Sequence, residues 1–147
     1  MSSLNIELVL EGAATVACFP VMRQLRLDLS EDEFVQRVAR QRPQGYQLLA
    51  ASIEGEVVAV AGFRVLDNLA WGRFLYVDDL VTGDAHRSHS FGGQLLDWLV
   101  AYCQENAIAE LHLDSGVQRF GAHRFYLDHR MDITSHHFAI EIPIGAE

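Results

Sequence analysis

The sequence contains no lysine: all 11 of its basic residues are arginine. A phosphate-binding lysine of the Walker type and a lysine that forms a Schiff base are therefore both excluded. Acidic residues are more numerous, and the formal net charge is −9. Because a nucleic-acid-binding protein needs a basic surface to neutralise phosphates, nucleic acid is not expected as a main partner.

Cysteine is also scarce, and the sequence has no Cys-x-x-Cys or His-Glu-x-x-His spacing. Cys18 and Cys103 lie in apolar helical patterns, which predicts buried free thiols and fits a reducing cytoplasm. The seven histidines have no zinc-ligand spacing, so no metal site is expected. No apolar run approaches the ~20 residues of a membrane span, and the first residues do not resemble a secretory signal. We therefore expect a cytoplasmic protein without a membrane partner.

The hydrophobic pattern predicts an α/β (α+β) fold. A chain of 147 residues, half of them hydrophobic, suits a single domain over residues 1–147. Strands are predicted at residues 5–10, 46–53, 56–66, 71–81, 110–114 and 132–142, and helices at residues 13–27, 31–42, 90–106 and 118–128. Ser30 and Glu33 have the spacing of a capping box at the start of the second helix. This order predicts a mixed, mostly antiparallel sheet with helices on both faces, in which strand 110–114 runs parallel to strand 71–81.

The segment between strand 71–81 and the following helix has the features of an anion site. Backbone N–H groups at a helix N-terminus are unpaired, and the helix dipole favours negative charge there. Two consecutive glycines let a ligand approach the main chain, and an arginine adds a charge suited to phosphate. We predict that this segment binds a pyrophosphate through Arg87, Ser88, His89, Ser90, Phe91, Gly92 and Gly93. The alternative is an ordinary polar loop with a glycine-rich helix start.

Two motifs in this order resemble a known family. The stretch Arg87-Ser88-His89-Ser90-Phe91-Gly92 resembles motif A, Arg/Gln-x-x-Gly-x-Gly/Ala, of the GNAT superfamily of acyl-CoA-dependent N-acyltransferases. It departs at one position, where Ser90 replaces the usual glycine. Downstream, Ala122-His123-Arg124-Phe125-Tyr126 follows a predicted strand and resembles motif B, Ala-x-x-Phe-Tyr. The two motifs at this spacing are more specific than either one alone.

The resemblance implies the GNAT fold, in which the parallel central strands four and five splay apart. In this family the pantetheine arm of acetyl-CoA enters the gap and pairs with the main chain of strand four, here Leu80, Val81 and Thr82. Ser115 is implied as a further cofactor contact by its motif position. Tyr126 is implied as the general acid that protonates the leaving sulfur, and its alternative is an aromatic side chain packed at a helix edge.

Asp78 and Asp79 are the candidates for the general base, because an acid in an apolar strand is anomalous. Adjacent strand residues face opposite sides, so at most one of them should enter the site unless a bulge intervenes. Asp79 is slightly favoured because it lies nearer the implied splay. The alternative is a salt bridge with Arg64 or Arg73.

We therefore expect an acetyl-CoA-dependent N-acetyltransferase in which the acceptor attacks directly in a ternary complex. The acceptor would be a primary amine of a small molecule, a peptide or a protein lysine. In the family, the region corresponding to residues 23–42 walls the acceptor pocket, although its mixed charges also fit a solvated face. The alternative function is a non-catalytic acyl-CoA-binding or regulatory module on the same fold. We also consider a homodimer through an exposed strand edge.

Overall fold

The computed structural model describes residues 3–10 and 12–145, apart from the side chain of Ser88. These residues form two compact units, one ending at Leu113 and the other beginning at Asp114. The single domain expected from the sequence stays a prediction.

The first unit is built on a five-stranded sheet whose strands follow one another in chain order. They are β1 (Asn5–Val9), β2 (Gln47–Ile53), β3 (Glu56–Asn68), β4 (Gly72–Thr82) and β5 (Glu110–Leu113). The pairs from β1 to β4 are antiparallel, and β5 pairs in parallel with β4 after the crossover helix α4 (Phe91–Glu105). The predicted mixed sheet, with its parallel pair in the expected place, is therefore confirmed.

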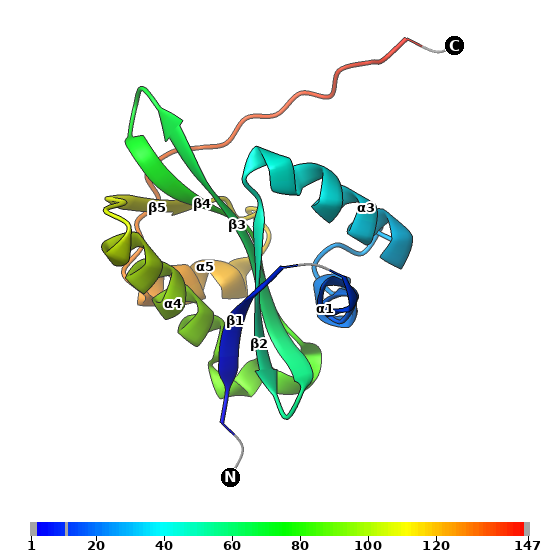
Figure 1. Cartoon of the computed structure of the whole chain (residues 1–147). Coiled ribbons are helices and arrows are strands. Elements are labelled where there is room, and N and C mark those ends of the chain that lie inside the picture. Colours follow the sequence, from blue (N-terminus) through cyan, green and yellow to red (C-terminus); the bar gives the residue numbers. More distant parts are fainter. Residues whose placement is uncertain (1–2, 11, 146–147) are drawn as a thin grey trace. The chain divides into compact units, whose positions relative to one another are not determined.

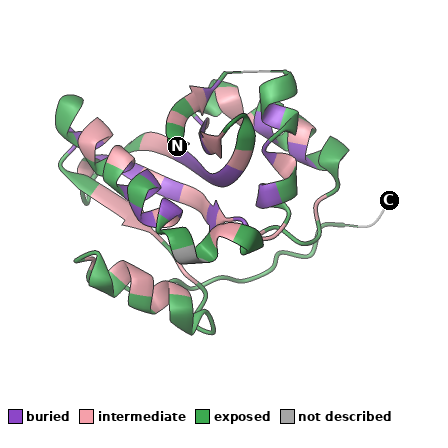
Figure 2. Ribbon diagram, turned by 90° about the horizontal axis from the view of Figure 1, so that it is seen from below, coloured by how far each residue is buried: buried purple, intermediate pink, exposed green. Residues whose placement is uncertain are grey.

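Helices cover both faces of this sheet, as predicted (Figure 1). Successive strand residues point to opposite faces. Accordingly, Leu48 and Ala50 pack with the side that carries α1 (Ala13–Val16), α2 (Phe19–Met22) and α3 (Glu31–Gln41). Leu49 and Ala51 pack with α4 on the other side. Figure 2 shows the buried residues along the strands and on the inner sides of α3 and α4.

Two details differ from the predicted helices. The helix expected over residues 13–27 is divided into α1 and α2, with Pro20 in the first turn of α2. Proline fits there because it lacks the N–H that an interior helical position must donate. Short 3₁₀ helices, η1 (Arg42–Gln44) and η2 (Asp84–His89), follow α3 and β4.

Composition led to expectations about the two cysteines, membrane spans and metal ligands. Cys18 and Cys103 are free and buried, which confirms the prediction for both thiols. Within residues 3–10 and 12–145, no helix is both long enough and apolar enough to cross a membrane. The described part of the chain also contains no group of three or more His, Cys, Asp or Glu residues that could hold a metal ion.

The second unit contains α5 (Phe120–Asp128) and a C-terminal segment without regular structure. The strand predicted at residues 132–142 is wrong: in the described part of this unit no residue belongs to a strand. Phe138, Ile140 and Ile142 alternate as in a strand, but their side chains are 70–90% exposed. An alternation of apolar and polar residues only favours a strand. A strand forms when its backbone makes a ladder of hydrogen bonds with a neighbouring strand.

Candidate functional site

A β-bulge in β4 places two consecutive carboxylates on the same face of the sheet. Gly62 of β3 is opposite Asp79, and the next residue, Phe63, is opposite Val77. Asp78 is therefore the extra residue of the bulge and has no partner on β3. Before the bulge, Leu75 and Val77 pack in the core under α4, whereas after it Leu80 does so. The strand alternation is thus reset between Asp78 and Asp79, which is the exception that the sequence analysis allowed for.

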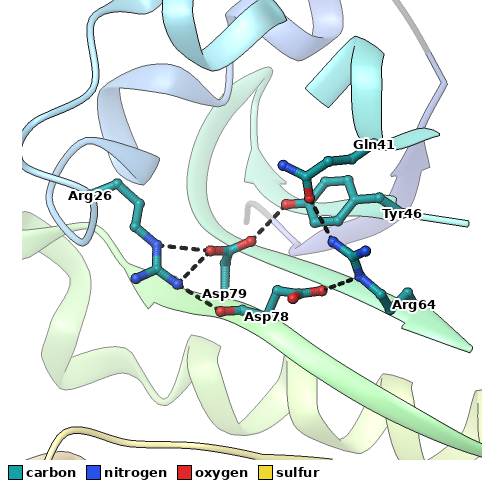
Figure 3. Close-up of polar contacts among 6 residues, drawn as sticks. All are labelled: Arg26, Gln41, Tyr46, Arg64, Asp78 and Asp79. Carbon is teal, nitrogen blue, oxygen red and sulfur yellow. Dashed lines mark hydrogen bonds and ion pairs between the residues drawn. The ribbon is translucent and has the colours of Figure 1, made fainter. Parts of the chain in front are cut away.

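Asp79 is held at both carboxylate oxygens. Arg26 donates from Nε and Nη2 to Oδ1 at 2.9 and 2.8 Å, and the Tyr46 hydroxyl donates to Oδ2 at 2.8 Å (Figure 3). Arg26 Nη2 also donates to the backbone oxygen of Asp78 at 2.8 Å. Only 12% of the Asp79 side chain is exposed. Both carboxylate oxygens of Asp79 therefore accept hydrogen bonds from other residues of the protein, and these contacts fix the position of the side chain.

Tyr46 approaches Asp79 across Gly62. A Cβ added at Gly62 would overlap the Tyr46 hydroxyl and would lie 2.5 Å from Asp79 Oδ2. The glycine is thus required for close approach within the strand. Burial, followed by the negative charge of Asp79, raises the pKa of Tyr46 well above its usual value. The phenol consequently stays protonated and remains a donor to Asp79.

Asp78 is held on one side only. Arg64 Nε donates to Asp78 Oδ2 at 2.9 Å, and Arg64 Nη2 donates to Gln41 Oε1 at 2.6 Å. The described residues offer Asp78 Oδ1 no hydrogen bond, and 26% of the side chain is exposed. Burial raises the pKa of the Asp78 carboxyl above its ordinary value, although the Arg64 contact opposes this effect. This carboxylate keeps one oxygen available and binds a proton more readily than an exposed aspartate does.

The salt-bridge alternative is partly correct. Arg64 pairs with Asp78 as that alternative proposed, but Arg73 instead donates to the backbone oxygen of Asn106 at 2.5 Å. Asp79 pairs with Arg26, which belongs to the segment that the resemblance assigned to the acceptor wall.

Both carboxylates line a cavity of about 330 Å³ in the first unit. This volume lies at the lower end of the range for small-molecule sites. The wall consists of Met22, Arg26, Leu29, Phe34, Arg37, Val38, Gln41, Tyr46, Tyr76, Asp78 and Asp79. It combines an apolar lining with two acids and two arginines, so it can hold a small polar molecule that has an apolar part.

The predicted pyrophosphate segment occupies η2 and the start of α4. Ser90 adopts a left-handed conformation with φ 56°, and its side chain does not cap the helix. The first amides of α4 therefore receive no side-chain acceptor from the N-cap residue. Arg87 is 60% exposed and pairs with Asp84 at 2.8 Å, and its Nε lies 3.4 Å from the Thr82 oxygen.

The other residues of the predicted pyrophosphate segment differ in how far their side chains are exposed to solvent. His89 is exposed and stacks on Phe91, while Phe91 itself is only 8% exposed and packs in the core under α4. Gly92 is half-buried and Gly93 is buried. The side chain of Ser88 lies outside the described residues. Phe91 and the glycines can therefore contribute only main-chain groups to an anion.

The edge of β4 is open where the resemblance implies the pantetheine arm. β5 pairs with β4 only from Phe74 to Val77. In the described part of the first unit, residues 78–82 have no strand partner on that side. The side chains of Leu80 and Val81 pack in opposite cores, and Thr82 is half-buried. Their main chain is thus the part that an added extended ligand can reach.

Two predicted residues lie in the second unit. The Ser115 hydroxyl oxygen is buried and has no hydrogen-bond partner among the described residues. Tyr126 lies in α5 with its ring centroid 5.4 Å from that of Phe125. Burial raises the pKa of Tyr126, and the charge of Arg119 partly opposes this. A protonated phenol can donate, but the role of Tyr126 as general acid stays a prediction.

Sequence reasoning did not single out Tyr46, Gln41 or Gly62 as parts of the site, although Gln41 lies in the segment 23–42 that the resemblance assigned to the acceptor wall. Tyr46 precedes a strand and Gln41 ends a helix, positions that have no chemical signature of their own. One signal was present: Gly62 interrupts an apolar strand, and an interior strand glycine often marks close approach of another group.

Comparison with known proteins gives a consistent assignment. The model of the acetyltransferase (GNAT) family matches residues 15–130. An uncharacterized N-acetyltransferase, YhdJ of Bacillus subtilis (strain 168), is 31% identical over 127 residues, which cover 86% of this chain and 89% of that protein.

Solved structures with the same fold are more distant in sequence. The aminoglycoside N-acetyltransferase AAC(6')-Iy in complex with CoA has a TM-score of 0.83 at 10% identity, covering 98% of this chain and 97% of its own. The ribosomal-protein-alanine N-acetyltransferase of Brucella melitensis biovar Abortus 2308 has a TM-score of 0.80 at 18% identity, covering 95% and 99%. At these identities the likeness establishes the fold alone.

Proposed function

Because the chain belongs to the acetyltransferase (GNAT) family, we propose that it transfers an acetyl group from acetyl-CoA to a primary amine held in the cavity beside β4. The observation that carries the proposal is the bulge, which places Asp78 and Asp79 together on the wall of one small cavity. A lone structural ion pair would not require this departure from strand alternation.

Two features support acetyl-CoA as the donor. The start of α4 has no side-chain cap, and residues 78–82 have an open strand edge. Such a helix start accepts a pyrophosphate, and such an edge accepts an extended amide-bearing chain. Arg87 and the main chain of residues 80–82 and 91–93 would hold the donor; the contact from Ser115 of the second unit stays an expectation from the resemblance.

In the reaction, Asp78 accepts the proton that the amine must lose, through the oxygen that Arg64 does not occupy. The amine nitrogen forms a bond to the thioester carbon, the carbon–sulfur bond breaks, and the sulfur takes a proton from Tyr126 or water. Asp79 has both oxygens in use, so we assign it to positioning together with Arg26 and Tyr46. The sequence slightly favoured Asp79 as the base, whereas the contacts favour Asp78.

The test is release of free thiol from acetyl-CoA with a panel of amines. Asp78→Asn should lower kcat/KM by about 10²–10⁴-fold, the usual contribution of a general base. Since the base must be ionised, wild-type kcat/KM should fall as the pH drops through the raised pKa of Asp78, and the variant should lose this acid limb. Asp79→Asn is the matched variant: it should lower Tm and keep the acid limb. A wild-type pH profile in Asp78→Asn would remove the assignment.

The alternative of a non-catalytic acyl-CoA-binding module has one observation in its favour, since both carboxylates already form ion pairs. Calorimetry with acetyl-CoA separates the two functions. Binding without thiol release from any amine would establish the module and contradict the enzyme.

A further inference from the structure

Of the two arginines that line the acceptor cavity, Arg37 forms no ion pair or hydrogen bond with another described residue. The cavity-lining face of α3 consists of Phe34, Arg37, Val38 and Gln41, which follow the i, i+3, i+4, i+7 spacing of one helix face. Phe34 and Val38 are 3% and 4% exposed. Arg37 lies between these two buried apolar residues on the same helix face and is itself exposed, at the edge of the cavity.

The other two arginines around this cavity are held in ion pairs. Arg26 forms its ion pair with Asp79 at 2.8 Å, and Arg64 forms its pair with Asp78 at 2.9 Å. Among the described residues, Arg37 has no ion pair or hydrogen bond. Glu33, one turn earlier on α3, accepts from the backbone amide of Ser30 at 3.0 Å and completes the helix cap. The hydrogen bonds with Ser30, and to a smaller extent the charge of Arg37, lower the pKa of Glu33, so Arg37 interacts with Glu33 through charge but not through a hydrogen bond. The guanidinium of Arg37 is therefore the one on the cavity wall whose donors are not used by another described residue.

The position of this charge relative to Asp78 is set by the helix. Gln41 anchors the Arg64 guanidinium that holds Asp78, and Arg37 lies four residues before Gln41. Residues four apart on a helix are neighbours, with their Cβ atoms roughly 5–6 Å apart. A small molecule can thus face Asp78 with one group and Arg37 with another.

We infer that the acceptor is a small amine that also carries a carboxylate, as in an amino acid, with the amine facing Asp78 and the carboxylate bound by Arg37. This inference rests on the proposed function and names the substrate class of that site. Arginine presents a planar pair of donors that matches a carboxylate. The small cavity and its apolar walls at Phe34 and Val38 leave room for a short aliphatic side chain.

The experiment compares amino acids with their α-amides as acceptors, measured by thiol release from acetyl-CoA. An amide makes the neighbouring amine less basic, so simple reactivity favours the amide. Recognition by Arg37 should reverse that order: for at least one amino acid, kcat/KM for the acid should exceed that for the amide by tenfold or more.

Arg37→Gln should lower the acid-to-amide ratio of kcat/KM to one or below, and Arg37→Lys should retain part of the preference for the acid. Arg40→Ala is the matched control, because Arg40 is exposed on α3 and does not line the cavity. Its ratio should equal that of the wild type. Thermal unfolding of each variant confirms folding.

The outcomes separate this inference from the proposed function. Equal or faster turnover of amides in the wild type, or a ratio unchanged in Arg37→Gln, would overturn the carboxylate acceptor and leave the acetyltransferase intact. Such a result would indicate an acceptor without a negative group, such as a peptide or protein amine. Absence of thiol release with every amine would overturn both.

Discussion

Two helices of the first unit have serine at the N-cap, and they use it in opposite ways. At the start of α3, Ser30 is extended, its Oγ accepts from the Glu33 amide at 3.1 Å, and the Ser30 amide donates to Glu33 Oε1 at 3.0 Å. At the start of α4, Ser90 is left-handed and its side chain makes no cap. The α3 start is satisfied by its own sequence, whereas the α4 start retains donors for an external anion.

The difference shows that residue type alone does not decide the role of a helix start. The backbone conformation of the N-cap residue directs its hydroxyl toward the first turn or away from it. A helix whose N-cap side chain accepts from the first backbone amides gains stability. A helix without such a cap keeps these amides as donors for a phosphate. Substitutions at one helix start at a time can test this difference.

The largest effect should come from placing a negative charge at the uncapped start of α4. Ser90→Asp adds a carboxylate at the N-cap, where it repels a pyrophosphate. We expect the affinity for CoA to fall about ten- to hundredfold, or about 1.4–2.7 kcal/mol, by isothermal titration calorimetry. Ser90→Asn is the uncharged control of similar shape. Equal affinities for the two variants would show that no phosphate lies at this helix start.

Removing the arginine beside the open start should have the next largest effect. Arg87→Ala should weaken CoA binding about tenfold, or about 1.4 kcal/mol, because one charge for the phosphates is lost. The fold should be unaffected, since the Arg87–Asp84 pair is 60% and 72% exposed and such pairs contribute little. Arg40→Ala is the control for loss of an exposed arginine, and calorimetry with parallel thermal unfolding distinguishes the outcomes. Unchanged affinity in Arg87→Ala would exclude Arg87 from the site.

The two helix starts also differ in how well they could be predicted. Ser30 and Glu33 are local partners, so their spacing alone predicted the cap. The place where α4 begins was predicted from its sequence pattern, whereas the pyrophosphate site at this start stays a prediction. The bulge at Asp78 could not be predicted, because it depends on the register between Gly62 and Phe63 of another strand. The strand expected near Phe138 was wrong for a related reason, since alternation does not supply a partner.

A substitution at the capped start of α3 should lower the stability of the protein and leave its affinity for CoA unchanged. Ser30→Ala removes the acceptor for the Glu33 amide and should lower the free energy of unfolding by about 1 kcal/mol, measured by urea denaturation. Its affinity for CoA should equal that of the wild type. Ser30→Asp, which keeps an acceptor at the N-cap, should remain near wild-type stability. Weaker CoA binding in Ser30→Ala would contradict the separation between the two helix starts.

The smallest effect should come from replacing each serine by glycine. The two substitutions should change the free energy of unfolding in opposite directions. Ser30→Gly should lower the free energy of unfolding by a few tenths of a kcal/mol, because the extended N-cap loses its hydroxyl. Ser90→Gly should raise it by about 0.5 kcal/mol, because a left-handed residue is strained by its Cβ and glycine is not, although glycine costs more chain entropy. Glycine is also the residue that motif A most often has at this position. Chemical denaturation of the two variants, run side by side with the wild type, measures both signs. Destabilisation by Ser90→Gly equal to that by Ser30→Gly would mean that the Ser90 hydroxyl caps α4 in solution, and the α4 start would then be closed like that of α3.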